Sequence, residues 1–136
     1  MRRFQLAVAA VLVALSLGGC AQLSVLTQGI SLATKTISNP VTKEDEAKVE
    51  LAVDTALQVL LVYKRACIAG TADKNCKSNV AMLQPYTRAA VPLLGQLRQF
   101  VDNNDQINAS VVYNQLTALY TNLKAAAQSV GVNVGS

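Results

Sequence analysis

The spacing of apolar residues between residues 42 and 131 constrains the fold of this chain more than any other feature. Three successive stretches place an apolar residue at steps of three or four, which is the period of one face of an α-helix. On the first stretch, residues 49–67, Ala52, Leu57 and Leu61 widen the apolar face. Because only short turns separate the stretches, the sequence predicts an all-α fold, an antiparallel three-helix bundle. The three faces consist of Val49, Val53, Ala56, Leu60, Tyr63 and Cys67; of Leu83, Tyr86, Ala90, Leu94, Leu97 and Val101; and of Val112, Leu116, Leu119, Leu123, Ala126 and Val130.

Residues with capping and stop preferences mark where the three helices begin and end. Thr42 is suited to cap the first helix, and acidic residues follow it where the helix dipole favours negative charge. Gly70 can close that helix in a left-handed conformation, as Gly131 can close the third. The second helix is expected over residues 75–103, and Asn108 is expected to cap the third.

Pro85 and Pro92 lie inside the second predicted helix, and each removes one backbone hydrogen bond. Because they are seven residues apart, they fall near one face, so that their bends should add. Two interpretations follow. The helix is either shaped into a groove for a partner, or it curves around its neighbours in the bundle.

Cys67 and Cys76 are expected to form a disulfide that staples the first helix to the second. The chain has no histidine to complete a usual zinc site, and a redox-active pair is more often spaced Cys-x-x-Cys. In one continuous helix the two Cα atoms would lie about 13.5 Å apart, whereas a disulfide needs less than about 7 Å. The chain must therefore turn near residues 70–73. Closing a loop of about ten residues stabilises the fold by roughly 2.5–3 kcal/mol.

The N-terminal segment has the composition of a bacterial export signal. A short basic stretch, Met1–Gln5, precedes an apolar stretch, Leu6–Leu17, that only Ser16 interrupts. A helix of about twelve residues rises about 18 Å, less than the roughly 30 Å of a bilayer's hydrocarbon core. A permanent transmembrane helix is therefore not expected in this segment.

The motif Leu17-Gly18-Gly19-Cys20, which closes this segment, resembles the lipobox of bacterial lipoproteins. The resemblance implies cleavage between Gly19 and Cys20, a diacylglyceryl group on the Cys20 sulfur and an acyl chain on its amino group. In enterobacterial lipoproteins an aspartate after the cysteine tends to retain the protein at the inner membrane. Ala21 at this position therefore implies an anchor in the outer membrane that faces the periplasm. The alternative is an ordinary cleaved signal in which Cys20 is incidental.

Residues 20–40 connect this anchor to the predicted bundle, which we assign to residues 41–136. Two interpretations remain open for the connection. It is either a mobile linker, or a marginal amphipathic helix that lies on the membrane or docks onto the bundle. Asn39 and Pro40 mark its end, since a residue before proline is pushed out of helical geometry. The helical interpretation depends on Leu23, Leu26, Ile30, Ala33 and Ile37.

Charge and composition exclude several classes of function. Removal of the signal, residues 1–19, leaves ten basic and eight acidic residues, a balance too small to predict nucleic-acid binding. Asp102 and Asp105 flank a turn that lacks the glycine and the glutamate of a calcium loop. With no histidine and no glycine-rich phosphate loop, we expect no metal site, no cofactor and no enzymatic activity.

Half of the acidic residues lie near the start of the first predicted helix. A functional acidic patch and a solvated helix N-terminus both explain them. These residues are Glu44, Asp45, Glu46 and Glu50.

A second resemblance covers about residues 60–123. A helix that ends in Tyr63-x-x-x-Cys67, a loop followed by Cys76 and the motif Tyr113-Asn114-x-Leu116 are similar to small uncharacterised proteins encoded in phage and prophage regions of proteobacteria. This resemblance implies envelope modification or a lysis-associated role.

Together these features predict a lipid-anchored, periplasm-facing interaction or structural module of the bacterial envelope. Its expected partners are the membrane, through the lipid, and an envelope protein. One alternative is a module that holds a small apolar ligand between kinked helices, and another is an envelope-perturbing protein that uses residues 20–40 on the membrane. A large exposed apolar patch would favour protein contacts, whereas an enclosed apolar cavity would favour ligand binding.

Overall fold

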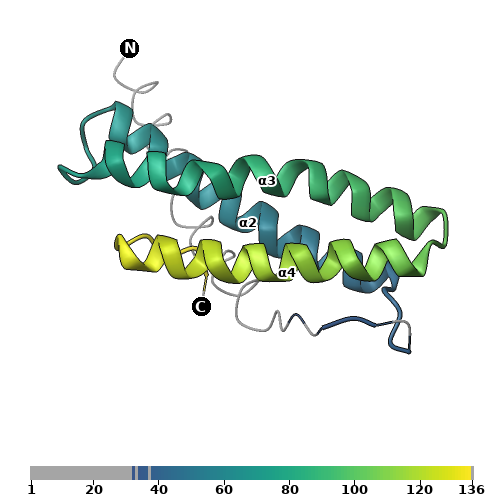
Figure 1. Ribbon diagram of the computed structural model, residues 1–136. Helices are drawn as coiled ribbons and strands as arrows, with labels where there is room; N and C mark the ends of the chain where they lie inside the picture. Colours follow the sequence, from purple (N-terminus) through teal and green to yellow (C-terminus); the bar gives the residue numbers. More distant parts are fainter. Residues whose placement is uncertain (1–31, 33, 37, 136) are drawn as a thin grey trace, which may run out of the picture. The chain divides into compact units, whose positions relative to one another are not determined.

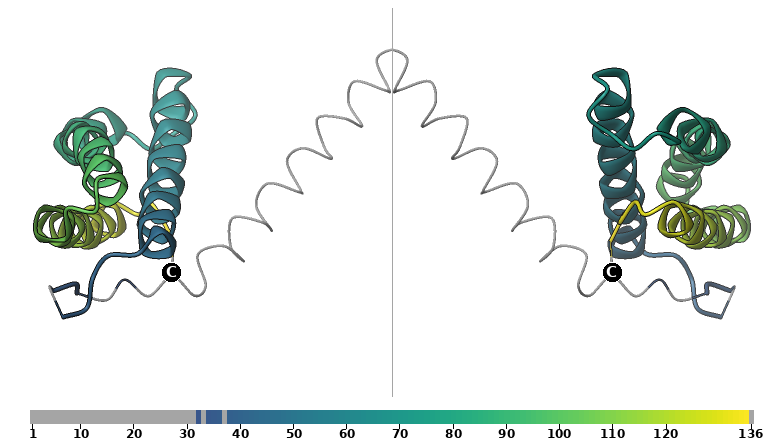
Figure 2. Two further views of the ribbon diagram at one scale, coloured as in Figure 1. Left: turned by 90° about the vertical axis from the view of Figure 1, so that its right-hand side faces the viewer. Right: turned by 90° about the vertical axis from the view of Figure 1, so that its left-hand side faces the viewer.

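Three long helices follow one another up, down and up in the computed structural model, which describes residues 32, 34–36 and 38–135 (Figure 1). They are α2, Lys43–Ile68, α3, Cys76–Asp102, and α4, Gln106–Ser129. Helices α3 and α4 run side by side, and α2 packs obliquely across the pair, as the views along the bundle show (Figure 2). The predicted all-α three-helix bundle is confirmed for this part of the chain.

The start of α2 matches the prediction, whereas the start of α4 does not. The Thr42 hydroxyl accepts a hydrogen bond from the Asp45 amide (3.1 Å), and the Asp45 carboxylate accepts one from the Thr42 amide (2.9 Å), which completes a capping box. Asn108 was the wrong cap for the third helix. Asp105 caps it instead, because its carboxylate accepts from the Asn108 amide (3.2 Å) and so lets the helix begin at Gln106, three residues earlier than an Asn108 cap would.

All three helices end in the same way, with one residue in the left-handed conformation directly after the last turn. Gly70 (φ 72°), Asn104 (φ 56°) and Gly131 (φ 77°) occupy this position. After α2, the Thr71 amide donates to the carbonyl of Ala66 and the Gly70 amide donates to that of Cys67, which satisfies two carbonyls that the helix leaves without partners. The predicted stops at Gly70 and Gly131 are confirmed.

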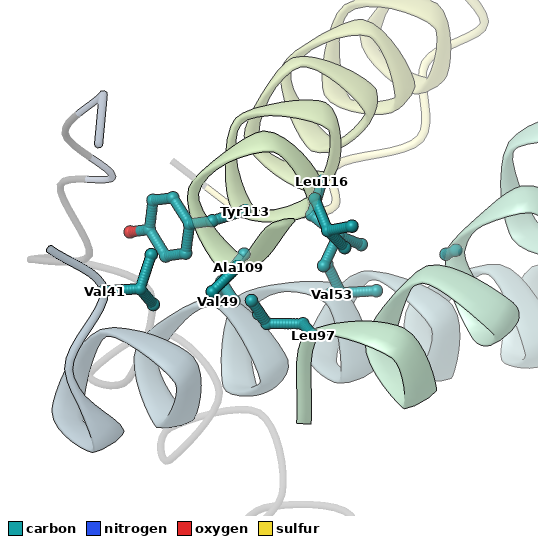
Figure 3. Packing of buried hydrophobic residues seen from close by; sticks show 9 residues of the cluster. Val41, Val49, Val53, Leu97, Ala109, Tyr113 and Leu116 are labelled. Atoms are coloured by element: carbon teal, nitrogen blue, oxygen red, sulfur yellow. The ribbon is translucent and has the colours of Figure 1, made fainter. Parts of the chain in front are cut away.

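The interior consists of two clusters of buried residues. One cluster, which includes Val41 from the segment before α2 (the strap, defined below), is called the strap-side core and lies between the first half of α2, the second half of α3 and the first half of α4 (Figure 3). The disulfide-side core lies at the other end and also contains Val132 and Val134, where the chain folds back after α4. The strap-side core contains Val41, Val49, Val53, Ala90, Leu97, Ala109, Val112, Tyr113 and Leu116, and the disulfide-side core contains Ala56, Leu60, Leu83, Leu123, Ala127, Val132 and Val134.

Most residues of the predicted apolar faces lie in or against these cores, with one clear exception. Leu61, which we expected to widen the face of the first helix, is 40% exposed. Conversely, Tyr113 lies outside the predicted face of the third helix and is only 1% exposed. The reason is that α4 packs against both α2 and α3, so its buried face is wider than one stripe, whereas Leu61 lines an open space between α2 and α3.

The described segment before α2, residues 34–36 and 38–41, is neither a helix nor a free linker. We call it the strap. Lys35 and Val41 are buried, and between them the chain makes a tight turn in which Thr36 and Asn39 exchange two backbone hydrogen bonds of 3.1 Å. The helical interpretation is wrong for residues 34–36 and 38–40, whereas residues 20–31, 33 and 37, which include the apolar positions on which it depends, lie outside the described chain. The strap is therefore packed against the bundle through Lys35 and Val41.

Candidate functional site

The disulfide joins the C-terminal end of α2 to the N-terminal end of α3. Cys67 and Cys76 are bonded, with their Cα atoms 5.6 Å apart, and the chain turns between them at Gly70 as the spacing requires. The predicted disulfide is confirmed. The other two predicted site residues, Gly19 at the cleavage position and Cys20 at the lipidation position, lie outside the residues that the structure describes.

A small polar network holds the same end of the two helices together. The Tyr63 hydroxyl donates a hydrogen bond to the Asp73 carboxylate (2.7 Å) and accepts one from the Asn79 side-chain amide (2.9 Å). Its pKa is raised above the usual range because partial burial and the Asp73 carboxylate disfavour the phenolate, although the Asn79 hydrogen bond opposes them. Tyr63 therefore stays neutral near pH 7 and fixes the loop between the helices to both of them.

An open groove runs between the second half of α2 and the first half of α3, beside this network. We call it the α2/α3 groove, and its volume is about 420 Å³. Leu60 and Leu83 of the disulfide-side core form its floor, and the exposed side chains of Leu61 and Val91 (63% exposed) stand at its edges. No residue of α4 or of the strap lines it. The lining consists of Leu57, Gln58, Leu60, Leu61, Tyr63, Lys64, Val80, Leu83, Gln84, Thr87, Arg88 and Val91.

Two cations stand at this groove, one on each helix. Lys64 comes from α2 and Arg88 from α3, and none of the lining residues is acidic. Within the described chain neither cation forms an ion pair. The groove thus combines an apolar floor with two positive charges that have no partner of opposite sign in the bundle.

The acidic residues at the start of α2, in contrast, all have partners within the chain. Glu44 pairs with Lys48 (2.6 Å), Asp45 with Lys35 (2.7 Å), Glu46 with Lys43 (3.1 Å) and Glu50 with Arg98 (2.6 Å). These pairs join the strap, α2 and α3 at the end opposite to the disulfide. The cluster therefore has a structural role, and its interpretation as a functional acidic patch is not needed.

The two aspartates of the turn between α3 and α4 are also engaged. Asp102 pairs with Lys43, and Asp105 caps α4. Among the described residues, no three cysteines, aspartates or glutamates gather closely enough to hold a metal ion. In the same part of the chain, none of the helices has an apolar stretch of the length needed to span a bilayer.

The sequence suggested a groove only on the second helix, and the contribution of α2 was not predicted because Leu57 and Leu61 were assigned to the core. Leu57, Leu61 and Lys64 are spaced four and three residues apart, so they form a second face of the same helix, beside the buried one. The signal in the sequence was that Lys64 lies on the same face of the helix as Leu57 and Leu61.

No family model, no curated protein and no solved structure matches this chain, so function is inferred from the groove and the sequence motifs.

Proposed function

We propose that this protein is a lipid-anchored, periplasm-facing interaction module of the bacterial envelope, without catalytic activity, and that it binds a partner protein through the α2/α3 groove. The observation that carries the proposal is the open, apolar groove between α2 and α3, with two lining cations that form no ion pair among the described residues. The export signal and the lipobox motif at Leu17-Gly18-Gly19-Cys20 support the envelope address and the anchor.

The openness of the groove favours a protein over a small apolar ligand. Sites for small molecules enclose about 70–90% of the ligand surface. Here Leu61 and Val91 stand exposed at the edges, so a molecule in the groove would keep one whole side in solvent. A protein segment that is itself part of a larger surface covers such an open site without that loss.

The strap favours an interaction module over an envelope-perturbing peptide. Lys35 is buried against the bundle, as is Val41 directly after the connection, so the end of residues 20–40 is not free to lie on a membrane. Between Cys20 and Leu32 the chain can span at most about 40 Å. A lipid on Cys20 would therefore hold the bundle, and its groove, close to the membrane surface.

Site-specific photo-crosslinking in intact bacteria that export the protein tests the proposal. A photoreactive amino acid at Val91, at the edge of the groove, should yield discrete crosslinked species, whereas the same probe at Asn122, exposed on α4, should not. The matched Cys20→Ser variant should lose both membrane association and these products. Equal crosslinking from both positions, or none from Val91, would contradict the groove as the partner site.

A further inference from the structure

We propose that the occupant of the α2/α3 groove is a single amphipathic helix with acidic residues along its polar flanks, presented by a partner protein. This inference rests on the proposed function and specifies the chemistry of the partner. It follows from the spacing of the lining residues, from the cations on the two helices and from the charge distribution of the bundle.

The lining residues have the spacing of ridges that receive a helix. On α2 they include Leu57, Leu61 and Lys64, and on α3 they include Val80, Gln84 and Val91. The α2 positions span about 10 Å along the helix axis and the α3 positions about 16 Å, which corresponds to two to three turns of a bound helix. A helix bound in a groove places its own apolar anchors at i, i+3, i+4 and i+7, a repeat that fits within this length.

The charge around the groove favours an acidic partner. Residues 57–91 contain five basic residues and one acidic residue, Asp73, and the Asp73 carboxylate accepts the hydrogen bond from Tyr63. Asp54 lies one turn before the groove on α2 and makes no ion pair within the described chain. Every ion pair that the described residues form lies at the other end of the bundle. The disulfide end is therefore positive and lacks internal compensation, which an acidic helix would supply.

Other occupants fit less well. The chain's own residues 21–31 carry no charge and offer nothing to Lys64 and Arg88. A second copy of the bundle would present its acidic end, but those carboxylates already form ion pairs within one chain. A bilayer surface is flat and cannot fill a groove whose floor, Leu60 and Leu83, is buried between two helices.

The test uses the full mature, lipidated protein in nanodiscs of zwitterionic lipid and two fluorescent peptides of about 18 residues. The peptides share one apolar helical face and differ only in carrying glutamates or lysines on the polar face. We expect the acidic peptide to bind roughly tenfold or more tightly than the basic one, and its affinity to fall as salt rises from about 0.05 to 0.5 M. Fluorescence anisotropy measures both affinities.

Matched variants identify the surface that binds. Lys64→Glu with Arg88→Glu should reverse the preference for the acidic peptide, whereas Lys124→Glu, a basic residue on α4 outside the groove, should leave it unchanged. Val91→Asp should abolish binding of the acidic peptide, but Val62→Asp, on α2 and equally exposed at 63%, should not. Circular dichroism verifies that each variant keeps its helices.

The outcomes separate this inference from the proposed function. Equal binding of both peptides, binding only to vesicles of anionic phosphatidylglycerol, or concentration-dependent self-association through the groove would each overturn the acidic-helix inference. If the Val91 probe still yields crosslinked protein in cells while neither peptide binds, the proposed interaction module is supported and the acidic-helix inference is overturned. If the peptide binds but Val91 yields no crosslinks, the proposed function fails in the cell.

Discussion

The side-chain amide of Asn114 forms two hydrogen bonds with the backbone of Lys35, a residue 79 positions earlier in the chain. The Lys35 amide donates to the Asn114 Oδ1 atom and the Asn114 Nδ2 atom donates to the Lys35 carbonyl, each over 2.8 Å. Gln106 holds the backbone of Val41 in the same way, over 3.0 and 3.2 Å. Two amides of α4 thus satisfy the strap's backbone groups, as a neighbouring β-strand would.

Replacing Asn114 by alanine should release the strap. The substitution leaves a donor and an acceptor of the partly buried Lys35 backbone without partners, which costs about 1–3 kcal/mol. We expect trypsin to cleave after Lys35 about tenfold faster than in the wild type, because local release exposes this bond. Asn122→Ala, at an exposed position of the same helix, is the control. An unchanged cleavage rate in Asn114→Ala would show that the amide does not hold the strap.

The Lys35–Asp45 ion pair makes the free energy of unfolding depend on pH. Partial burial raises the pKa of Asp45, but the hydrogen bonds from Lys35 and from the amide and hydroxyl of Thr42 outweigh it and bring the pKa below its ordinary value of 3.8. A carboxylate with a lowered pKa stabilises the fold above its unfolded-state pKa, and this contribution is lost as the pH falls through the folded value. The wild type should therefore lose this contribution as the pH falls below about 3.8.

Asp45→Asn isolates this contribution. The variant should unfold at lower urea concentration than the wild type at pH 7, and the difference should shrink as the pH is lowered towards 3. Asp54→Asn, at an exposed position without an ion pair among the described residues, should follow the wild type at every pH. If the difference between Asp45→Asn and the wild type stays constant with pH, the ion pair is not its source.

The docking of the strap is a feature that could not be predicted from the sequence, unlike the helices and the disulfide. Helix periodicity, Thr42, Gly70 and the Cys67–Cys76 spacing are local signals, and each predicted its element correctly. The docking of the strap depends on Asn114, a residue whose type alone does not indicate a backbone partner 79 positions away. Periodicity in residues 20–40 left a helix and a linker equally open, because it detects apolar spacing and not the side-chain amides that bind the backbone.

The cap of α4 and the α2 side of the groove were not predicted, for related reasons. Asp105 and Asn108 are both good N-caps, and the sequence offers no way to choose between them until the preceding turn is known. That turn ends with Asn104 in a left-handed conformation, which places Asp105 at the cap. Leu61 was assigned to the core because a second apolar flank on a helix looks the same whether a neighbouring helix covers it or leaves it open.

A substitution of Cys20 tests the predicted lipid attachment. We expect Cys20→Ser to abolish labelling by radioactive palmitate and to move the protein from the membrane to the soluble fraction, because the acyl chains would contribute about 0.8 kcal/mol for each buried methylene. Cys67→Ser is the matched control, since it removes a different cysteine and should keep the label. Continued labelling of Cys20→Ser would contradict the anchor.

The disulfide is expected to stabilise the fold and to preserve the shape of the groove. Cys67 and Cys76 close a short loop, and its loss should lower the free energy of unfolding by roughly 2.5–3 kcal/mol, measured by urea denaturation. Reduced wild type and the double variant Cys67→Ala with Cys76→Ala should agree, and a reductant should not change the double variant further. Because the bond joins α2 to α3 directly beside Tyr63, which lines the groove, both forms should also bind the acidic peptide more weakly than the oxidised wild type. A loss of stability with unchanged peptide affinity would show that the Tyr63–Asp73–Asn79 network alone keeps the groove in shape.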